Sequence, residues 1–356
     1  TPHRCKMLPS IPGALYNHGG IQAPVQLLVV PAIHITDIFA APDFGASAVR
    51  VTVTARNDMG KTSGGRFDVS IAPDKTGHVL ATAALSARWK CGESTHVLTL
   101  PVARPHQWDL DDPYLYRIRV KLIARGAGAD GDHERSVRCG FRDFRVEDGW
   151  FRLNGRRLFL KSTHTGNHFP IGQVVPHNPD FMRRDLIYAK ACGFNTVRFI
   201  AGVAWPEQLD FCDELGLMIY EESMAGWFLG DSPLMAERYD RAIREMILRD
   251  RNHPSVTIWG MLNETRDGAV FRHAVKALKL VRELDPTRLA LLNSGRWDAQ
   301  PMIGSVSNPG SCAWEPQWGA EGSRKKLAPI PPDKNPQAGG FQGAGDAHVY
   351  PRVPQT

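Results

Sequence analysis

The sequence predicts a multi-domain protein in which an all-β immunoglobulin-like sandwich precedes an incomplete (β/α)₈ TIM barrel. Its 356 residues suggest two or three domains, at about 150 residues per domain. Period-2 hydrophobic patterns fill the first third, and strand and helix patterns alternate from about residue 155. We therefore expect the tail of a preceding domain in residues 1–30, the sandwich in 31–145 and the barrel in 146–356.

Composition and charge exclude several classes of protein. The net charge is +6, and no dense block of basic residues indicates a nucleic-acid surface. Residues 7–36 carry no charge, but prolines would break a membrane-spanning helix there; these are Pro9, Pro12, Pro24 and Pro31. The six cysteines form no C-x-x-C pair, so neither structural zinc nor a disulfide scaffold is indicated, and we expect no cofactor.

The strands of the sandwich are expected where apolar and polar residues alternate. The clearest segments are 49–55, 67–71, 95–100 and 116–122. They are rich in β-branched residues, and turn sequences containing Gly and Asn separate them. This pattern is typical of an antiparallel β-sandwich.

The second region predicts a parallel sheet with helical crossovers. The expected strands are 157–161, 195–199, 217–220, 256–262, 289–292 and a short one near His348, and the expected helices are 180–192, 206–215, 233–248 and 270–284. Gly193 and Gly216 stand where helix C-caps belong. No G-x-G-x-x-G or Walker loop follows the early strands, which favours a barrel over a nucleotide-binding fold.

The barrel is expected to be incomplete. About six strands occur in some 200 residues, whereas a complete (β/α)₈ barrel takes about 250. The region 296–343 is rich in Gly, Pro and Trp without periodicity, and it is interpreted as a long loop on the active-site face. Two cysteines within helical patterns, Cys192 and Cys212, are expected to be small buried hydrophobic residues.

Polar residues recur where the barrel strands end. In such a barrel the carboxyl ends of the strands carry the function, and carboxylates, amides and imidazoles there suit a polyhydroxylated substrate. Glu264 follows an apolar run, an environment that raises a carboxyl pKa toward general-acid use. The alternative is that Glu264 only caps the next helix.

Several motifs resemble glycoside hydrolase family 2, which includes β-galactosidases, β-glucuronidases and β-mannosidases. The stretch 249–264, RDRNHPSVTIWGMLNE, resembles the acid/base signature of that family. NTVR at 195–198 and FCDELGLMIYEE at 211–222 resemble its other signature. WDLDDPYLY at 108–116, GFR at 140–142 and GGI at 19–21 resemble its sandwich end, its barrel entry and the end of its N-terminal jelly-roll sugar-binding domain.

The resemblance implies a set of roles. Glu264 would protonate the leaving oxygen and then activate water, while Asn263 would hydrogen-bond the 2-hydroxyl. Arg198 would orient carboxylates on the barrel floor. The remaining expected sugar contacts are His168, Glu222, His348 and Tyr350. Arg251 and His253 precede the fourth barrel strand and are interpreted as structural.

The resemblance also implies an activity. The protein would be a retaining exo-β-glycosidase that hydrolyses the bond to a terminal β-linked sugar. The nucleophilic Glu of the family ends the seventh strand, so we expect it beyond this sequence and expect the 356 residues alone to be inactive. The loop 162–170 and the residues after Arg198 depart from the galactosidase and glucuronidase patterns, so the identity of the bound sugar stays open. A requirement for Mg²⁺ is likewise not supported. The alternatives are a non-hydrolytic carbohydrate-binding or scaffold module and, more remotely, a nucleotide-dependent α/β enzyme.

Overall fold

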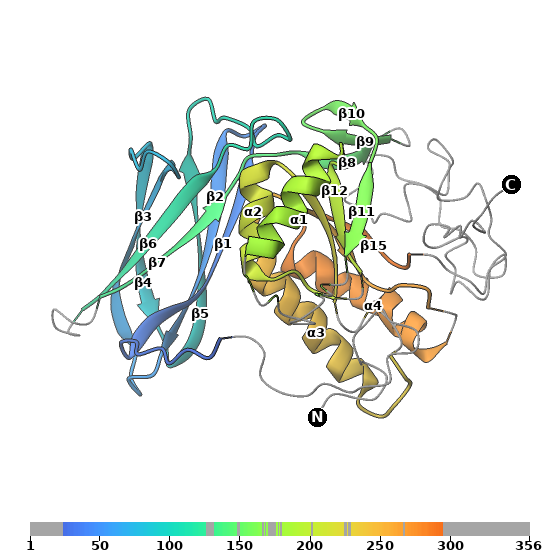
Figure 1. Ribbon diagram of the computed structural model, residues 1–356. Helices are drawn as coiled ribbons and strands as arrows, with labels where there is room; N and C mark the ends of the chain where they lie inside the picture. The colour runs from blue at the N-terminus through green and yellow to red at the C-terminus, as the bar shows by residue number, and fades with distance from the viewer. Residues whose placement is uncertain are drawn as a thin grey trace, which may run out of the picture.

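In the computed structural model, a β-sandwich lies beside a parallel sheet covered by helices (Figure 1). The structure describes residues 24–294, apart from 126–131, 148–149, 166, 168, 170–175, 177, 179, 201, 224–225, 227–228 and 266–267. The predicted order, sandwich and then barrel, is confirmed. Residues 1–23 of the expected tail (1–30), the loop 296–343 and the strand near His348 lie outside the described residues, and residues 24–30 form no helix or strand.

The sandwich consists of two antiparallel sheets. One has the order β1-β2-β5, and the other has the order β4-β3-β6-β7. The strands are β1 (Ile33–Asp43), β2 (Ala48–Asn57), β3 (Ser63–Pro73), β4 (Ala81–Trp89), β5 (Gly92–Pro101), β6 (Tyr116–Ala124) and β7 (His133–Cys139). Alternate residues of facing strands, such as Val51 and Val53 on β2 and Val69 and Ile71 on β3, are buried in one core between the sheets.

A small antiparallel sheet joins the sandwich to the barrel. It has the order β10-β9-β8 and comprises β8 (Phe144–Glu147), β9 (Trp150–Leu153) and β10 (Arg156–Leu158). The expectation of a first barrel strand at 157–161 is wrong, because Arg156–Leu158 pairs with β9 in a hairpin. The first parallel strand is instead β11 (Ser162–Thr165).

The barrel part is a parallel sheet of five strands in sequence order, β11-β12-β13-β14-β15. The elements are β11, α1 (Asp180–Ala191), β12 (Thr196–Phe199), α2 (Pro206–Leu215), β13 (Met218–Glu222), α3 (Met235–Asp250), β14 (Val256–Gly260), α4 (Ala269–Leu284) and β15 (Leu289–Leu291). Gly216 ends α2 at φ 66°, as the cap pattern predicts. Cys212 is buried as expected, but Cys192 is exposed because it follows the last turn of α1.

The two faces of this sheet have different partners. Val197, Ile219 and Trp259 pack with the helices in one core. Met218, Tyr220 and Ile258 face the other way, into a second core shared with the β8-β9-β10 sheet. Neighbouring residues of one strand therefore face opposite sides, which decides where each polar residue at a strand end lies.

A cluster of charged residues joins the sandwich to the amino ends of the parallel strands. We call this cluster, formed by Arg138, Asp210, Asp213 and His253, the boundary network. Arg138 of β7 contacts Asp210 at 2.5 Å, and the His253 Nδ1 to Asp213 Oδ2 distance is 2.6 Å. Asp213, which is fully buried, also accepts hydrogen bonds from the Ser255 backbone N–H and hydroxyl. These contacts hold the two domains together.

Candidate active site

Three polar side chains meet inside the barrel, at the carboxyl ends of successive strands. We call Arg198, Glu222 and Asn263 the rim network. Arg198 of β12 donates from Nε and Nη2 to Glu222 Oε1, at 2.8 and 2.6 Å, and from Nη2 to Asn263 Oδ1 at 2.5 Å. The parallel register places Arg198 beside Tyr220 of β13, whose ring lies 5.0 Å from the guanidinium carbon. The sheet itself therefore brings residues 24 and 65 positions from Arg198 into contact.

The orientation of the Asn263 amide follows from this contact. Arg198 is only a donor, so the Asn263 oxygen must face it and the Nδ2 group must face elsewhere. Asn263 is fully buried, and its Nδ2 has no hydrogen-bond partner within the described part of the chain. Since buried donors are rarely left unpaired, this amide is available to donate to an oxygen of a ligand.

Glu264 follows directly at the rim. Its backbone N–H donates to Ser294 O at 2.7 Å, which extends the pairing of β14 with β15 past the strand ends. Its φ of 46° lies in the left-handed region, uncommon for a residue other than Gly. Neighbouring hydrogen bonds hold the backbone there, because the Asn263 N–H donates to Gly226 O and the Thr265 hydroxyl to Asn263 O. The structure thus places Glu264 next to the rim network on a tightly fixed turn.

Gly260 creates the space that the rim network occupies. A Cβ atom at this position would lie 2.4 Å from both Glu222 Cγ and Tyr220 Cε2. Any larger residue at position 260 would therefore push these side chains away. Gly260 was not among the residues predicted for the site, although a Gly inside an apolar strand signals such a close approach.

The two adjacent glutamates of β13 occupy different environments. Glu222 points into the barrel, whereas Glu221 points toward the helices and accepts a hydrogen bond from the Ala204 backbone N–H at 2.8 Å. Burial, with Asp250 nearby, raises the pKa of Glu221 well above its ordinary value. Arg249, 3.7 Å from Glu221, donates to the carbonyl of Ala204. Glu221 and Arg249 thus fix the loop after β12 rather than the barrel interior.

A pair of amides links the loop after β11 to the first turn of α2, and sequence reasoning missed it. Gln208 donates to Asn167 Oδ1 at 2.8 Å and accepts from the Trp205 backbone N–H at 2.9 Å. Asn167 follows β11 and is buried, at a φ of 54°. Because Asn167 and Gln208 lie 41 residues apart, only the fold brings them together.

The structure brings Arg198, Glu222, Asn263 and Glu264 to one rim. Three other expected sugar contacts, His168, His348 and Tyr350, lie outside the described residues. Arg251 and His253 lie at the opposite end of the strands, where Arg251 contacts Asp37 of β1 and the Leu284 carbonyl.

Only one group of three possible metal ligands occurs in the described ranges, and it lies in the boundary network. Its members are Asp210, Asp213 and His253. The Arg138 guanidinium already supplies positive charge there, 2.5 Å from Asp210 and 3.9 Å from Asp213. We therefore read the group as an interdomain contact.

A β-sandwich followed by a parallel β/α sheet with a Glu at the end of the fourth strand is the architecture of a class of carbohydrate hydrolases. Residues 33–142 match the family described as "Glycosyl hydrolases family 2", and residues 144–319 match "Glycosyl hydrolases family 2, TIM barrel domain". The chain belongs to glycosyl hydrolases family 2, and the resemblance found in the sequence is confirmed.

Relatives within the family differ in the sugar they act on. A β-galactosidase from Photobacterium profundum is 30% identical over 284 residues, which are 76% of this chain and 27% of that protein. A family 2 β-galacturonidase from Eisenbergiella tayi is 25% identical with a TM-score of 0.65, over 74% of this chain and 46% of that one. A β-glucuronidase from Parabacteroides merdae is also 25% identical with a TM-score of 0.65, over 80% and 38%. The chain spans less than half the length of each.

Among the described residues, no helix is long and apolar enough to cross a membrane.

Proposed function

We propose that the protein is a retaining exo-β-glycosidase in which Glu264 is the general acid and base. The observation that carries this proposal is the position of Glu264, fixed at the rim directly after Asn263 and the rim network. Its support is the family membership of the chain together with the Asn263 amide beside it, whose Nδ2 has no partner in the part of the chain that the structure describes.

Glu264 first donates its proton to the glycosidic oxygen, so the leaving group departs as a neutral alcohol. The resulting carboxylate then removes a proton from water, which attacks the glycosyl–enzyme intermediate. Asn263 Nδ2 donates to the sugar 2-hydroxyl, a bond that strengthens as positive charge develops on the ring. Arg198 and Glu222 hold Asn263 in this orientation, which makes them positioning residues.

The mechanism needs a second carboxylate as nucleophile, about 5–5.5 Å from the acid. Glu222 is already paired with Arg198, and Glu221 faces the helices. The proposal therefore takes the nucleophile from a carboxylate other than these two.

The proposed substrate class is a terminal β-linked hexose or hexuronic acid. The named relatives act on galactosides, galacturonides and glucuronides, so the first experiment tests the full-length protein against a panel of aryl β-glycosides covering these sugars. Sugar binding without turnover on any of them would favour a non-hydrolytic module instead.

The acid role predicts how Glu264→Gln depends on the leaving group. General acid help is worth roughly 10²–10⁴-fold for a poor leaving group and little for an activated aryl group that departs without a proton. We expect kcat/KM to fall by that range on alkyl glycosides and far less on dinitrophenyl glycosides. The measurement is a leaving-group series, with Glu237→Gln on the exposed side of α3 as control.

An equal loss across the series would contradict the assignment of Glu264. An activated 2-fluoro glycoside, followed by peptide mass spectrometry, identifies the nucleophile separately because it traps the covalent intermediate. Labelling of Glu222 or Glu221 would overturn the exclusion of these residues.

A further inference from the structure

We propose that the outer face of the sandwich carries an oxyanion-binding cleft that holds a carboxylate or sulfate group of an acidic glycan. The cleft lies on the sheet β4-β3-β6-β7, and the barrel rim contributes none of its lining residues. Its volume is about 470 Å³. The inference is therefore independent of the catalytic proposal.

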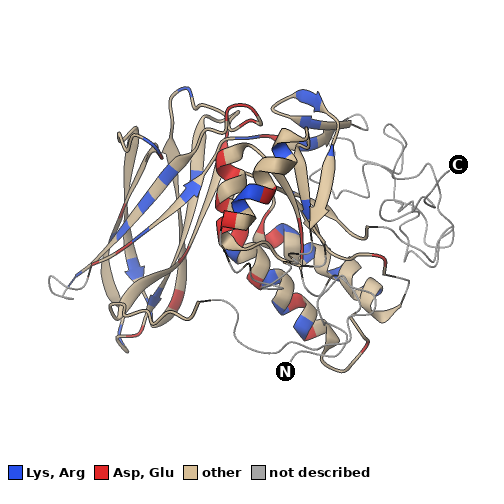
Figure 2. Ribbon diagram, in the orientation of Figure 1, with Lys and Arg blue, Asp and Glu red and all other residues tan. Residues whose placement is uncertain are grey.

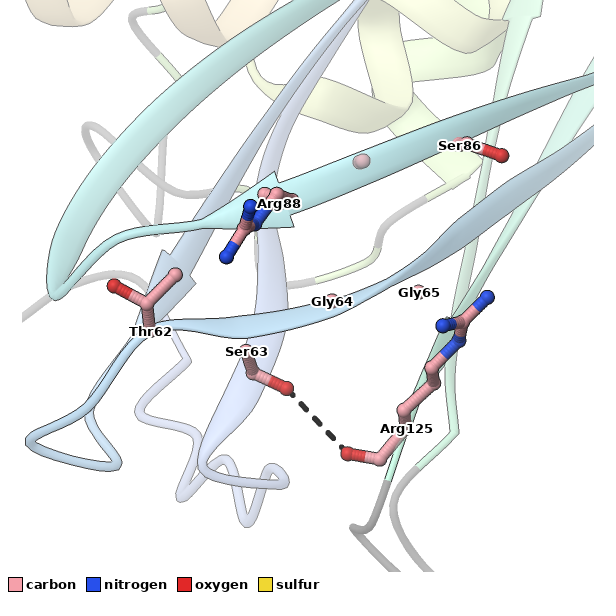
Figure 3. Close-up of a pocket in the computed structure, with 8 residues that line it drawn as sticks. Thr62, Ser63, Gly64, Gly65, Ser86, Arg88 and Arg125 are labelled. Carbon is pink, nitrogen blue, oxygen red and sulfur yellow. Dashed lines mark hydrogen bonds between the residues drawn. The ribbon is translucent and has the colours of Figure 1, made fainter.

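Strand register places two arginines on either side of one glycine. Gly64 of β3 is the partner of Arg88 on β4. On the other side of β3, the Arg125 backbone N–H donates to Gly64 O at 2.8 Å. Arg88 of β4, Gly64 of β3 and Arg125, the residue after β6, thus form one row across the sheet, and two strand spacings separate the arginine backbones by about 10 Å. Figure 3 shows both guanidinium groups flanking the glycine pair.

The glycines leave the floor of the cleft open. A Cβ atom at Gly64 would meet nothing nearer than the Ala87 carbonyl oxygen at 3.9 Å. Gly65 faces the core, where a Cβ would lie 2.8 Å from the Trp89 ring. The other lining side chains are small and mostly polar: Thr62, Ser63, Ser86 and Ala87. A ligand here contacts guanidinium groups, hydroxyls and backbone.

The charges on this face single out the same two arginines. Figure 2 shows basic residues along these strands. The other basic side chains of the face have acidic partners, in the pairs Arg66–Asp68, Arg117–Asp74, Arg119–Glu134 and Lys121–Asp132. Arg88 and Arg125 have no acidic partner among the residues that the structure describes. Two exposed guanidinium groups that face one cleft, with no acidic partner in the described ranges, attract an anion.

The shape of the cleft indicates the kind of anion. The planar guanidinium fork matches a carboxylate or sulfate, to which it can donate two parallel hydrogen bonds. The lining holds no aromatic ring and no apolar side chain larger than Ala87, which disfavours lipids, aryl compounds and stacked bases. A polar ligand that carries oxyanions, as an acidic glycan does, fits this lining.

The test is calorimetric titration of the whole protein with four probes. These are an oligogalacturonate, a sulfated galactan oligosaccharide, a neutral galactan oligosaccharide of equal length, and inorganic sulfate. The variants are Arg88→Gln, Arg125→Gln and Gly64→Glu, the last of which places a carboxylate between the arginines where the space is open. Arg50→Gln on β2 is the matched control, an exposed arginine outside the cleft.

We expect an acidic oligosaccharide to bind and the neutral one not to bind at this site. Each arginine variant should weaken binding about tenfold, because each removes one charge-assisted contact. Gly64→Glu should abolish binding, and Arg50→Gln should leave it unchanged. Preference for the oligogalacturonate or for the sulfated chain identifies which oxyanion the cleft holds.

Three outcomes would overturn the proposal: equal affinity for the neutral oligosaccharide, acidic binding that survives Gly64→Glu, or binding of inorganic sulfate alone. Turnover is not measured, so failure here leaves the assignment of Glu264 untouched.

Discussion

The parallel strands of the barrel carry a network of charged and polar side chains at each end, and the two networks differ in how completely their hydrogen-bonding groups are paired. At the carboxyl ends, the rim network holds the Asn263 amide with its Nδ2 unpaired among the described residues. At the amino ends, the boundary network fully engages Asp213, whose side chain accepts from His253 and Ser255 while its carbonyl accepts from the Trp108 indole. The unpaired Asn263 donor lies beside Glu264, where a ligand could accept from it, whereas the fully paired Asp213 carboxylate is part of a structural contact between the domains.

The largest expected effect on stability comes from breaking the boundary network. Asp213→Ala removes a fully buried carboxylate and leaves its donors without an acceptor. Breaking a buried charged pair in this way costs on the order of 3–5 kcal/mol. We expect denaturant unfolding to report a loss of that size, with kcat on aryl glycosides unchanged for the folded fraction.

Asp210→Ala is the matched control, because Asp210 is half exposed and its loss should cost much less. Equal losses for the two variants would show that the boundary network does not depend on the buried carboxylate.

The adjacent glutamates of β13 allow a sharper comparison on one strand. Glu222→Gln removes the negative charge that faces Arg198 and weakens two charge-assisted hydrogen bonds, at a cost of about 1.5–3 kcal/mol. Glu221→Gln should cost less, because the raised pKa of Glu221 favours a protonated carboxyl, which the amide resembles. Chemical denaturation at pH 7 measures both variants.

The two glutamate variants should also differ in their catalytic activity. Glu222→Gln frees Asn263 to reorient and should lower kcat/KM more for natural glycosides than for analogues that lack the 2-hydroxyl. If Glu221→Gln lowers kcat/KM as much as Glu222→Gln, the division of the two faces is wrong.

The smallest expected effect depends on pH. Burial alone would lower the pKa of His253, but the charge and hydrogen bond of Asp213 outweigh it and raise the pKa. A raised pKa means that the stabilisation by His253 is complete below the unfolded value of about 6.5 and is lost as the pH rises through the folded value. We expect His253→Gln to lower stability by about 1.5 kcal/mol at pH 6 and by less at pH 9.

Thermal unfolding of the wild type and His253→Gln from pH 6 to pH 9 tests this expectation. A Tm difference that stays constant or grows with pH would contradict the proposed charge on His253.

Local patterns were enough to predict most elements of the barrel. The bounds predicted for the helix 206–215 agree with the structure, because Pro206 begins this helix and Gly216 caps it. The prediction of a barrel strand at 157–161 is wrong, because a short apolar run does not reveal whether the strand pairs in a hairpin or in the parallel sheet. Only the register of β9 with β10 resolves this.

For the site, a motif predicted Glu264, Asn263 and Arg198, but not the contacts between them. Nothing in the Glu-Glu sequence of β13 says which glutamate faces Arg198, because the answer depends on which face the helices cover. Likewise, the contact of Arg138 with Asp210 spans 72 residues and two domains, so no local pattern signals it.

The turn before β14 also has a consequence for the order of folding. The Asn252 side chain accepts a hydrogen bond from the Ala40 backbone N–H and donates one to the Ile38 carbonyl. These contacts join residues 212 and 214 positions apart in the sequence. During synthesis, β1 emerges long before this turn exists, and closing so long a loop costs entropy that only later contacts repay. We therefore expect the sandwich to fold around its own core first and to dock onto the barrel in a late step of folding.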